Sequence, residues 1–125
     1  MSLLFKHLKI EGDIGGDELE ALFDTGATYS FIRKDRAQGV ATILPLPHPK
    51  SFELAERGKV LEARERIIID TIVNGVTISD EVVIVEDLSE ELILRASTMQ
   101  KWWTRLDLEK GDVIIDPRAV RLKLV

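Results

Sequence analysis

Cysteine is absent from the 125-residue chain, which excludes a disulfide framework and a thiolate metal site. The two histidines, His7 and His48, lack the HExxH-type spacing of a zinc enzyme. No apolar run approaches the roughly 20 residues that a membrane-spanning helix needs. A secretory signal peptide is not expected, because Lys6 and Lys9 interrupt the first apolar residues. We therefore expect a cytoplasmic protein with no metal, no organic cofactor and no membrane partner.

Basic residues are fewer than acidic ones, 17 against 22, which gives a net charge of −5 and argues against a nucleic-acid partner. Hydrophobic residues make up 45% and charged residues 31% of the chain, a composition typical of an ordered globular domain. The length fits one domain, which we assign to residues 1–125. A chain of this size can bury a core without covalent crosslinks.

Short apolar stretches separated by turn residues predict roughly eight short strands. The strand signals lie in residues 4–10, 18–23, 31–32, 51–54, 59–65, 67–73, 76–78, 82–85, 92–94, 113–115 and 120–125. Residues 18–23 could be helical by propensity alone, but a strand that leads into the next tight turn is the more coherent interpretation. The first strand, residues 4–10, is expected at a sheet edge. The pattern indicates a mostly β domain, closed or strongly curled, with one or two short helices.

Turn residues divide these strands. Residues 12–17 predict a hairpin turn in which glycine supplies positive φ, and Asn74-Gly75 predicts a second tight hairpin. Residues 33–38 suggest a helical turn or two that Gly39 ends. Residues 97–100 resemble a capping box that starts a short helix.

Three prolines at alternate positions, Pro45, Pro47 and Pro49, forbid a helix and a central strand. We interpret this segment as an extended surface connection. A proline-rich recognition motif is the less favoured alternative.

The sharpest chemical signal is Asp24-Thr25-Gly26-Ala27. Gly26 permits a tight turn and close approach of another backbone, and the Thr25 hydroxyl can bond to a main-chain carbonyl. Asp24 would therefore project from a rigid loop. Two carboxylates about 3 Å apart share one proton, so that one acts as base toward a water and the other as acid. The sequence holds one such tripeptide, so a pair requires a two-fold dimer.

The run from Ile14 to Ala27 resembles the corresponding part of the retroviral-type aspartic proteases, the retropepsins. Residues 52–58 look like the flap hairpin of their cellular and bacterial relatives. Residues 87–94 resemble the strand before the family's second turn, and residues 102–115 resemble its closing segment. The resemblance spans roughly residues 10–115, nearly the whole chain.

This resemblance implies a small closed acid-protease barrel that works as a homodimer, with Asp24 as the catalytic residue of each subunit. Thr25 would lock the two loops together and Gly26 would shape the turn. The remaining implied residues contact an extended peptide or unfolded protein substrate: Ala27 in the channel, and Leu54, Ala55, Glu56, Arg57 and Gly58 in the flap. The final strand, residues 120–125, is either an edge of the barrel or, as the resemblance favours, part of a dimer sheet.

Two departures from the family pattern motivate an alternative to the enzyme. Arg95 stands where the family has a glycine that packs closely beneath the catalytic loop. Its side chain would point outward on an unchanged backbone, or the local path would differ; a guanidinium near Asp24 would weaken proton sharing. Glu56-Arg57 occupies a flap tip that is glycine-rich in retroviral enzymes. The alternative is a catalytically inactive peptide-binding or dimerisation module on the same fold.

Overall fold

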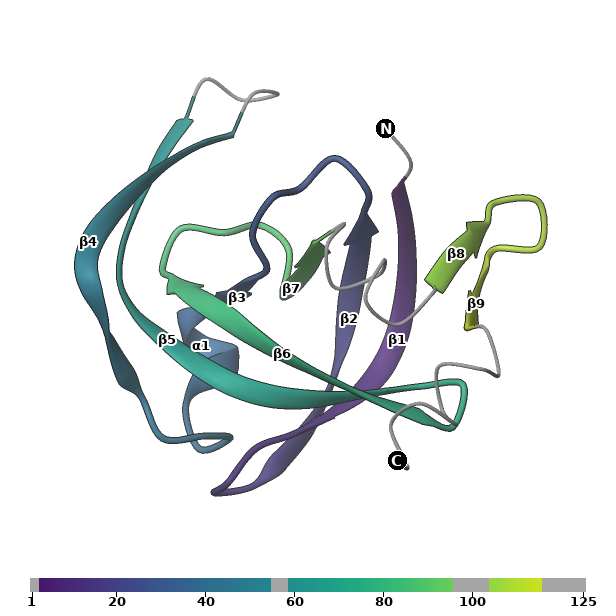
Figure 1. Cartoon of the computed structure of the whole chain (residues 1–125), viewed down its shortest axis with the longest axis horizontal. Helices are drawn as coiled ribbons and strands as arrows, with labels where there is room; N and C mark the ends of the chain where they lie inside the picture. The colour runs from purple at the N-terminus through teal and green to yellow at the C-terminus, as the bar shows by residue number, and fades with distance from the viewer. Residues whose placement is uncertain (1–2, 55–58, 96–103, 116–125) are drawn as a thin grey trace.

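The computed structural model describes residues 3–54, 59–95 and 104–115. Within these ranges the chain forms nine strands and one short helix (Figure 1). In chain order they are β1 Leu3–Glu11, β2 Gly16–Asp24, β3 Phe31–Arg33, α1 Lys34–Ala37, β4 Leu44–Leu54, β5 Lys59–Val73, β6 Val76–Val85, β7 Leu92–Arg95, β8 Thr104–Asp107 and β9 Asp112–Ile115. None of the helices in the described ranges is long and apolar enough to cross a membrane.

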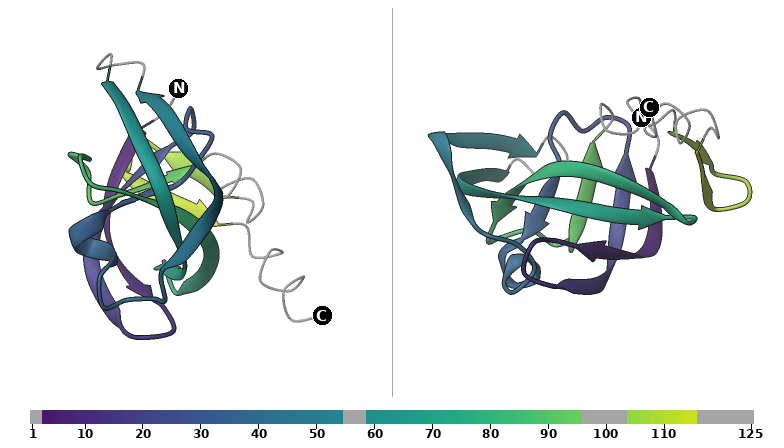
Figure 2. Two further views of the ribbon diagram at one scale, coloured as in Figure 1. Left: turned by 90° about the vertical axis from the view of Figure 1, so that its left-hand side faces the viewer. Right: turned by 60° about the horizontal axis from the view of Figure 1, so that its bottom comes forward.

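Six strands close into a barrel in the order β1-β2-β7-β3-β6-β5 (Figure 2). Closure comes from β1, whose residues Lys9–Glu11 pair antiparallel with Asp70–Ile72 of β5. The expected mostly β barrel with a short helix is confirmed. The expectation that the first strand lies at an edge is wrong for its last three residues, because the curl of the sheet brings them against β5.

Two apolar clusters fill the fold. The larger lies inside the barrel and includes Ile10, Phe23, Ile67 and Leu92, each 1% exposed or less. The smaller lies between the segment after β2 and the strands β4 and β5. Its buried members are Leu22, Phe31, Leu61, Ala63, Val83, Val85, Leu88 and Ile93. Alternation along β2 explains both clusters, since neighbouring side chains of one strand point to opposite faces.

The proline segment, which the sequence indicated as a surface connection, forms the first part of strand β4. Among the strands of the described residues, β4 pairs with β5 alone, and it lies outside the barrel, at the end of the strand order. Its register shifts between Pro45 and Lys50, because prolines cannot donate to a ladder and are tolerated at an edge or a bulge. The connection is therefore an irregular edge strand.

The remaining local expectations are mostly confirmed. Asn74 and Gly75 have φ of 49° and 79° and join β5 to β6, as a tight hairpin requires. Gly39 (φ 77°) follows α1. Residues 76–85 form one strand where two were expected, and β8 was not expected. The expected turn residues 55–58, capping box 97–100 and strand 120–125 lie outside the described residues.

Gly12 does not supply the positive φ expected in the β1–β2 turn. Positive-φ glycines in the described ranges are Gly39, Gly75 and Gly111. A Cβ at Gly12 would instead lie 2.3 Å from the carbonyl oxygen of Val40 and 2.6 Å from the Ala41 Cβ. The glycine is required because the segment after α1 packs directly against this turn.

We expect Gly12→Ala to destabilise the fold by roughly 1–3 kcal/mol, because the new methyl group forces the backbone at Val40 to move. Urea unfolding followed by circular dichroism measures the loss. A change below about 0.5 kcal/mol, the range of neutral surface substitutions, would contradict the close packing at this turn.

Candidate active site

Asp24 is the last residue of β2 and is held by strands on both sides. It is the register partner of Leu3 in β1 and of Arg95 in β7. The preceding residue, Phe23, is 1% exposed and anchors the strand end in the barrel core. The Asp24 side chain is partly exposed, so a carboxylate projects from a fixed point of the barrel wall.

Residues 24–30, which run from the last residue of β2 to the residue before β3, form a segment that we call the Asp24 loop. Asp24 Oδ1 accepts a hydrogen bond from the Gly26 N–H at 2.8 Å, and the Asp24 carbonyl oxygen accepts one from the Ala27 N–H at 3.1 Å. Both bonds are local, so the loop itself orients the carboxylate. Thr25 and Gly26 are exposed, which leaves this turn accessible to a partner molecule.

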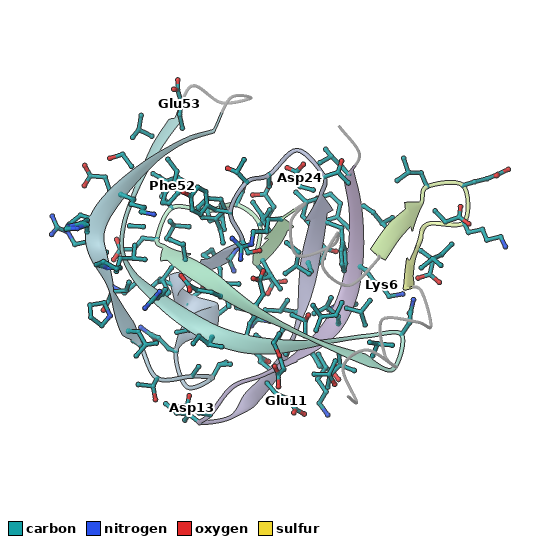
Figure 3. All side chains as sticks on the ribbon, in the orientation of Figure 1. Lys6, Glu11, Asp13, Asp24, Phe52 and Glu53 are labelled. Atoms are coloured by element: carbon teal, nitrogen blue, oxygen red, sulfur yellow. The ribbon has the colours of Figure 1, made fainter. Side chains whose placement is uncertain are left out.

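An aromatic cluster joins the Asp24 loop to β4. Tyr29 and Phe52 meet edge to face at a centroid distance of 4.8 Å, and Phe31 and Phe52 do so at 5.0 Å. Lys50 Nζ lies 5.2 Å from the Tyr29 ring centroid. Figure 3 shows Asp24, Phe52 and Glu53 at the same end of the molecule. The β4–β5 hairpin is thereby packed against the loop that carries the carboxylate.

Arg95 keeps the extended path of β7 despite replacing the glycine expected from the family pattern. Its Nη2 donates to Asp80 Oδ1 at 3.0 Å. The Asp80 side chain is 4% exposed and the Arg95 side chain 30%. Arg95 thus takes part in the regular pairing of β7 with β2, and its side chain is partly buried and directed to Asp80 of β6 rather than fully outward.

The structure brings four of the expected site residues together, Asp24, Thr25, Gly26 and Ala27, in one turn. Ala27 also packs against the smaller apolar cluster. Leu54 ends β4 and its backbone pairs with Lys59. Ala55, Glu56, Arg57 and Gly58 lie outside the described residues, so their substrate contacts stay predictions.

Sequence reasoning did not identify Tyr29, Ser30 or Asp80 as residues near this site, and it placed Phe52 only at the start of the flap hairpin. Tyr29 and Phe52 come from segments that no local motif connects. Ser30 and Asp80 are 50 positions apart, and their side chains meet only because β3 and β6 pair in the barrel. No group of three or more metal-ligating side chains occurs in the described part of the chain.

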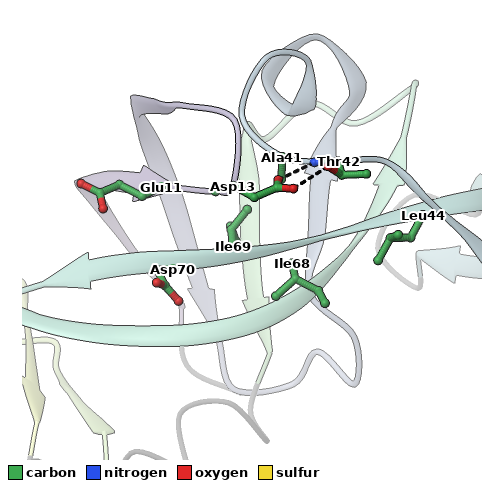
Figure 4. A pocket seen from close by; sticks show the side chains of 9 residues that line it. Glu11, Asp13, Ala41, Thr42, Leu44, Ile68, Ile69 and Asp70 are labelled. Carbon is green, nitrogen blue, oxygen red and sulfur yellow. Dashed lines mark hydrogen bonds between the residues drawn. The ribbon is translucent and has the colours of Figure 1, made fainter.

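A groove lies at the other end of the barrel, where Figure 3 places Glu11 and Asp13. It has a volume of about 590 Å³, and Figure 4 shows its lining residues. Asp13 accepts hydrogen bonds there from the backbone N–H and the hydroxyl of Thr42. The Thr42 hydroxyl, and then the Thr42 N–H, lower the pKa of Asp13 below its usual 3.8. This groove connects the β1–β2 turn to the segment before β4 and is separate from the Asp24 loop.

We expect Thr42→Val to raise the pKa of Asp13 toward 3.8, because the variant keeps the N–H donor but loses the hydroxyl. A folded-state pKa below the unfolded value stabilises the fold above the unfolded value, and that contribution disappears as the pH falls through the lowered value. The wild type should therefore exceed the variant in stability at neutral pH, with the difference vanishing in strong acid. NMR titration of the Asp13 carboxyl carbon is the direct measurement, and an unchanged pKa would refute the assignment.

This architecture is similar to that of a known crystal structure. The crystal structure of the retroviral protease-like domain of Ddi1 from Leishmania major is similar to this chain with a TM-score of 0.60 and 18% sequence identity. The match covers 93% of this chain and 89% of that domain. No protein-family model and no curated protein matches the sequence.

The chain therefore has a retropepsin-like fold, a small closed β barrel of six strands with a short helix. The resemblance noted in the sequence is supported at the level of the fold. The Asp-Thr-Gly turn lies in the loop that follows the second strand of this barrel.

Proposed function

We propose that this protein is an aspartic endopeptidase that is active as a homodimer. The observation that carries the proposal is the Asp24 loop: one carboxylate held by the turn's own hydrogen bonds, at the end of a barrel strand of a retropepsin-like fold. One chain supplies one such carboxylate, whereas peptide hydrolysis by the aspartic-type mechanism uses two that share a proton. A second copy supplies the other across a two-fold axis.

The proposed reaction uses the two Asp24 side chains as a pair. The unprotonated carboxylate takes a proton from a water whose oxygen attacks the scissile carbonyl carbon, and the protonated carboxyl gives its proton to the carbonyl oxygen. The tetrahedral intermediate then collapses: the C–N bond breaks, the amine leaves with a proton from the protonated carboxyl, and a hydroxyl of the intermediate returns its proton to the other carboxylate, which restores the singly protonated pair. Gly26 shapes the turn, and Thr25 would lock it to the partner loop.

The substrate we propose is an extended peptide or unfolded protein. An extended chain can pair its main chain with the β4–β5 hairpin near Leu54 and the flap residues 55–58, with Ala27 lining the channel. The aromatic cluster packs this hairpin against the Asp24 loop. We propose neither a nucleic-acid partner nor a membrane partner. The proposed location is the cytoplasm, with which the absence of cysteine is compatible.

Measuring activity at decreasing protein concentration tests whether two chains share one active site. We expect cleavage of an unfolded protein at mildly acidic pH, with activity per molecule falling as dilution separates the dimers. Sedimentation velocity over the same concentrations should show the same midpoint. A strictly monomeric protein that cleaves at constant specific activity would refute the homodimer, and absence of cleavage under all conditions would refute the enzyme.

The second candidate is a peptide-binding or dimerisation module without catalysis, favoured by Arg95 in place of glycine. It predicts that peptide binding survives Asp24→Asn and that the wild type turns over no peptide. Fluorescence anisotropy with labelled peptides, measured beside the cleavage assay, separates the two functions.

A further inference from the structure

Both ends of the Asp24 loop meet at Arg95. At one end, Asp24 is the register partner of Arg95 in the parallel pairing of β2 with β7. At the other, Ser30 Oγ accepts the Arg95 N–H at 3.1 Å. Ser30 is 1% exposed, and its carbonyl oxygen accepts the Val83 N–H at 2.9 Å. The loop is thus tied at its start and its end to one residue of the barrel wall.

A buried carboxylate completes this connection. The Ser30 oxygen accepts from the Arg95 backbone, and its own proton is donated to Asp80 Oδ2 at 2.5 Å. Asp80 Oδ1 accepts from the Arg95 guanidinium at 3.0 Å and from the Glu81 N–H at 2.9 Å. These bonds form a closed ring, which runs from the Arg95 backbone N–H through the Ser30 hydroxyl and the Asp80 carboxylate to the Arg95 guanidinium. Charge-assisted bonds to a buried carboxylate are stronger than neutral ones, so the ring fixes the position of Ser30.

We propose that Ser30, Asp80 and Arg95 are positioning residues that hold the Asp24 loop in its active shape. In the proteases that this chain resembles, a glycine at the position of Arg95 is expected to act through close backbone packing. Here the arginine acts through hydrogen bonds instead. The inference rests on the proposed function for its effect on turnover, whereas its effect on the order of the loop is independent of any activity.

Ser30→Ala tests the ring, and Ser79→Ala is its matched control. Ser79 Oγ also donates to a carboxylate at 2.5 Å, that of Asp70, but this bond joins β5 to β6 and does not involve the loop. The two variants therefore remove the same type of bond from adjacent parts of one sheet. Any general cost of losing a serine–aspartate bond should appear in both.

The first readout is backbone motion in the full chain, measured as ¹⁵N order parameters of Gly26 and Ala27. We expect Ser30→Ala to lower them from about 0.85 toward about 0.6, the values of rigid and flexible backbone. Ser79→Ala should leave them at the wild-type value. Equal order parameters in the two variants would overturn the proposal.

Arg95→Met provides a second variant if Ser30→Ala does not fold. It keeps the backbone N–H that Ser30 accepts and removes the guanidinium from Asp80. We expect the same increase in loop motion, and a rigid loop in this variant would count against the ring.

The second readout separates this inference from the proposed function. If the wild type cleaves peptides, Ser30→Ala should lower kcat about tenfold with KM nearly unchanged, because misplaced carboxylates lose rate more than binding. An equal loss in Ser79→Ala would indicate a merely structural role. If the wild type does not cleave but the loop loosens in Ser30→Ala alone, the proposed function fails and the positioning role stands.

Discussion

Replacing Asp24 with asparagine should reduce peptide cleavage at least about 10³-fold, because the substitution removes the acid and the base of a dimer at once. Asparagine keeps an oxygen that can accept the Gly26 N–H, now 2.8 Å from Asp24 Oδ1, so the turn should keep its shape. The partly exposed side chain adds little to the core. Thermal unfolding should therefore change little while kcat/KM collapses in a peptide cleavage assay.

Asp35→Asn is the control for the same chemical change. Asp35 lies in the first turn of α1 and pairs with Arg33 at 2.6 Å on the exposed surface. Its loss should leave cleavage intact, since exposed ion pairs contribute little. Mixing wild type with excess Asp24→Asn chains should also inhibit the wild type, because mixed dimers carry one carboxylate. Equal cleavage by wild type and Asp24→Asn would end the catalytic assignment.

Sequence patterns predicted the features that depend on interactions between residues close together in the chain. Imperfect alternation along residues 4–10 indicated β1, since the period of two follows from the geometry of a strand. Residues 18–23 were expected to form a strand because they lie between a hairpin turn and the tight turn at Asp24, and they form β2. Asn74-Gly75 predicted its hairpin because both residues tolerate positive φ. The tripeptide at Asp24 identified a turn that the structure forms.

Features that depend on distant residues were not predictable from such patterns. The β1–β5 contact that closes the barrel joins residues about 60 positions apart, and nothing in either segment encodes it. Gly12 is needed because Val40 lies against it, not because of its own φ. The ring through Arg95 is another case, since its backbone N–H reaches Ser30 65 positions away. An arginine at a glycine position is therefore interpretable only once its partners are known.

The largest stability effect is expected for Phe23→Ala. Phe23 is 1% exposed and lies in the larger apolar cluster directly before Asp24. Truncating a buried phenylalanine removes its transfer free energy and leaves a cavity, at a cost of about 3–5 kcal/mol. That is a large share of the roughly 5–15 kcal/mol by which domains are stable. Because Phe23 anchors the strand end that carries Asp24, the surviving folded protein should also lose activity.

Phe5→Ala separates burial from the loss of an aromatic ring. Phe5 lies on the neighbouring strand as the register partner of Leu22, but it is 53% exposed. Its truncation should cost less than about 1 kcal/mol, since most of the ring already contacts water. Urea unfolding at low protein concentration measures both variants without a contribution from dimerisation. Similar losses in the two would mean that the β2 end is not anchored by the barrel core, and the rigid presentation of Asp24 would need another source.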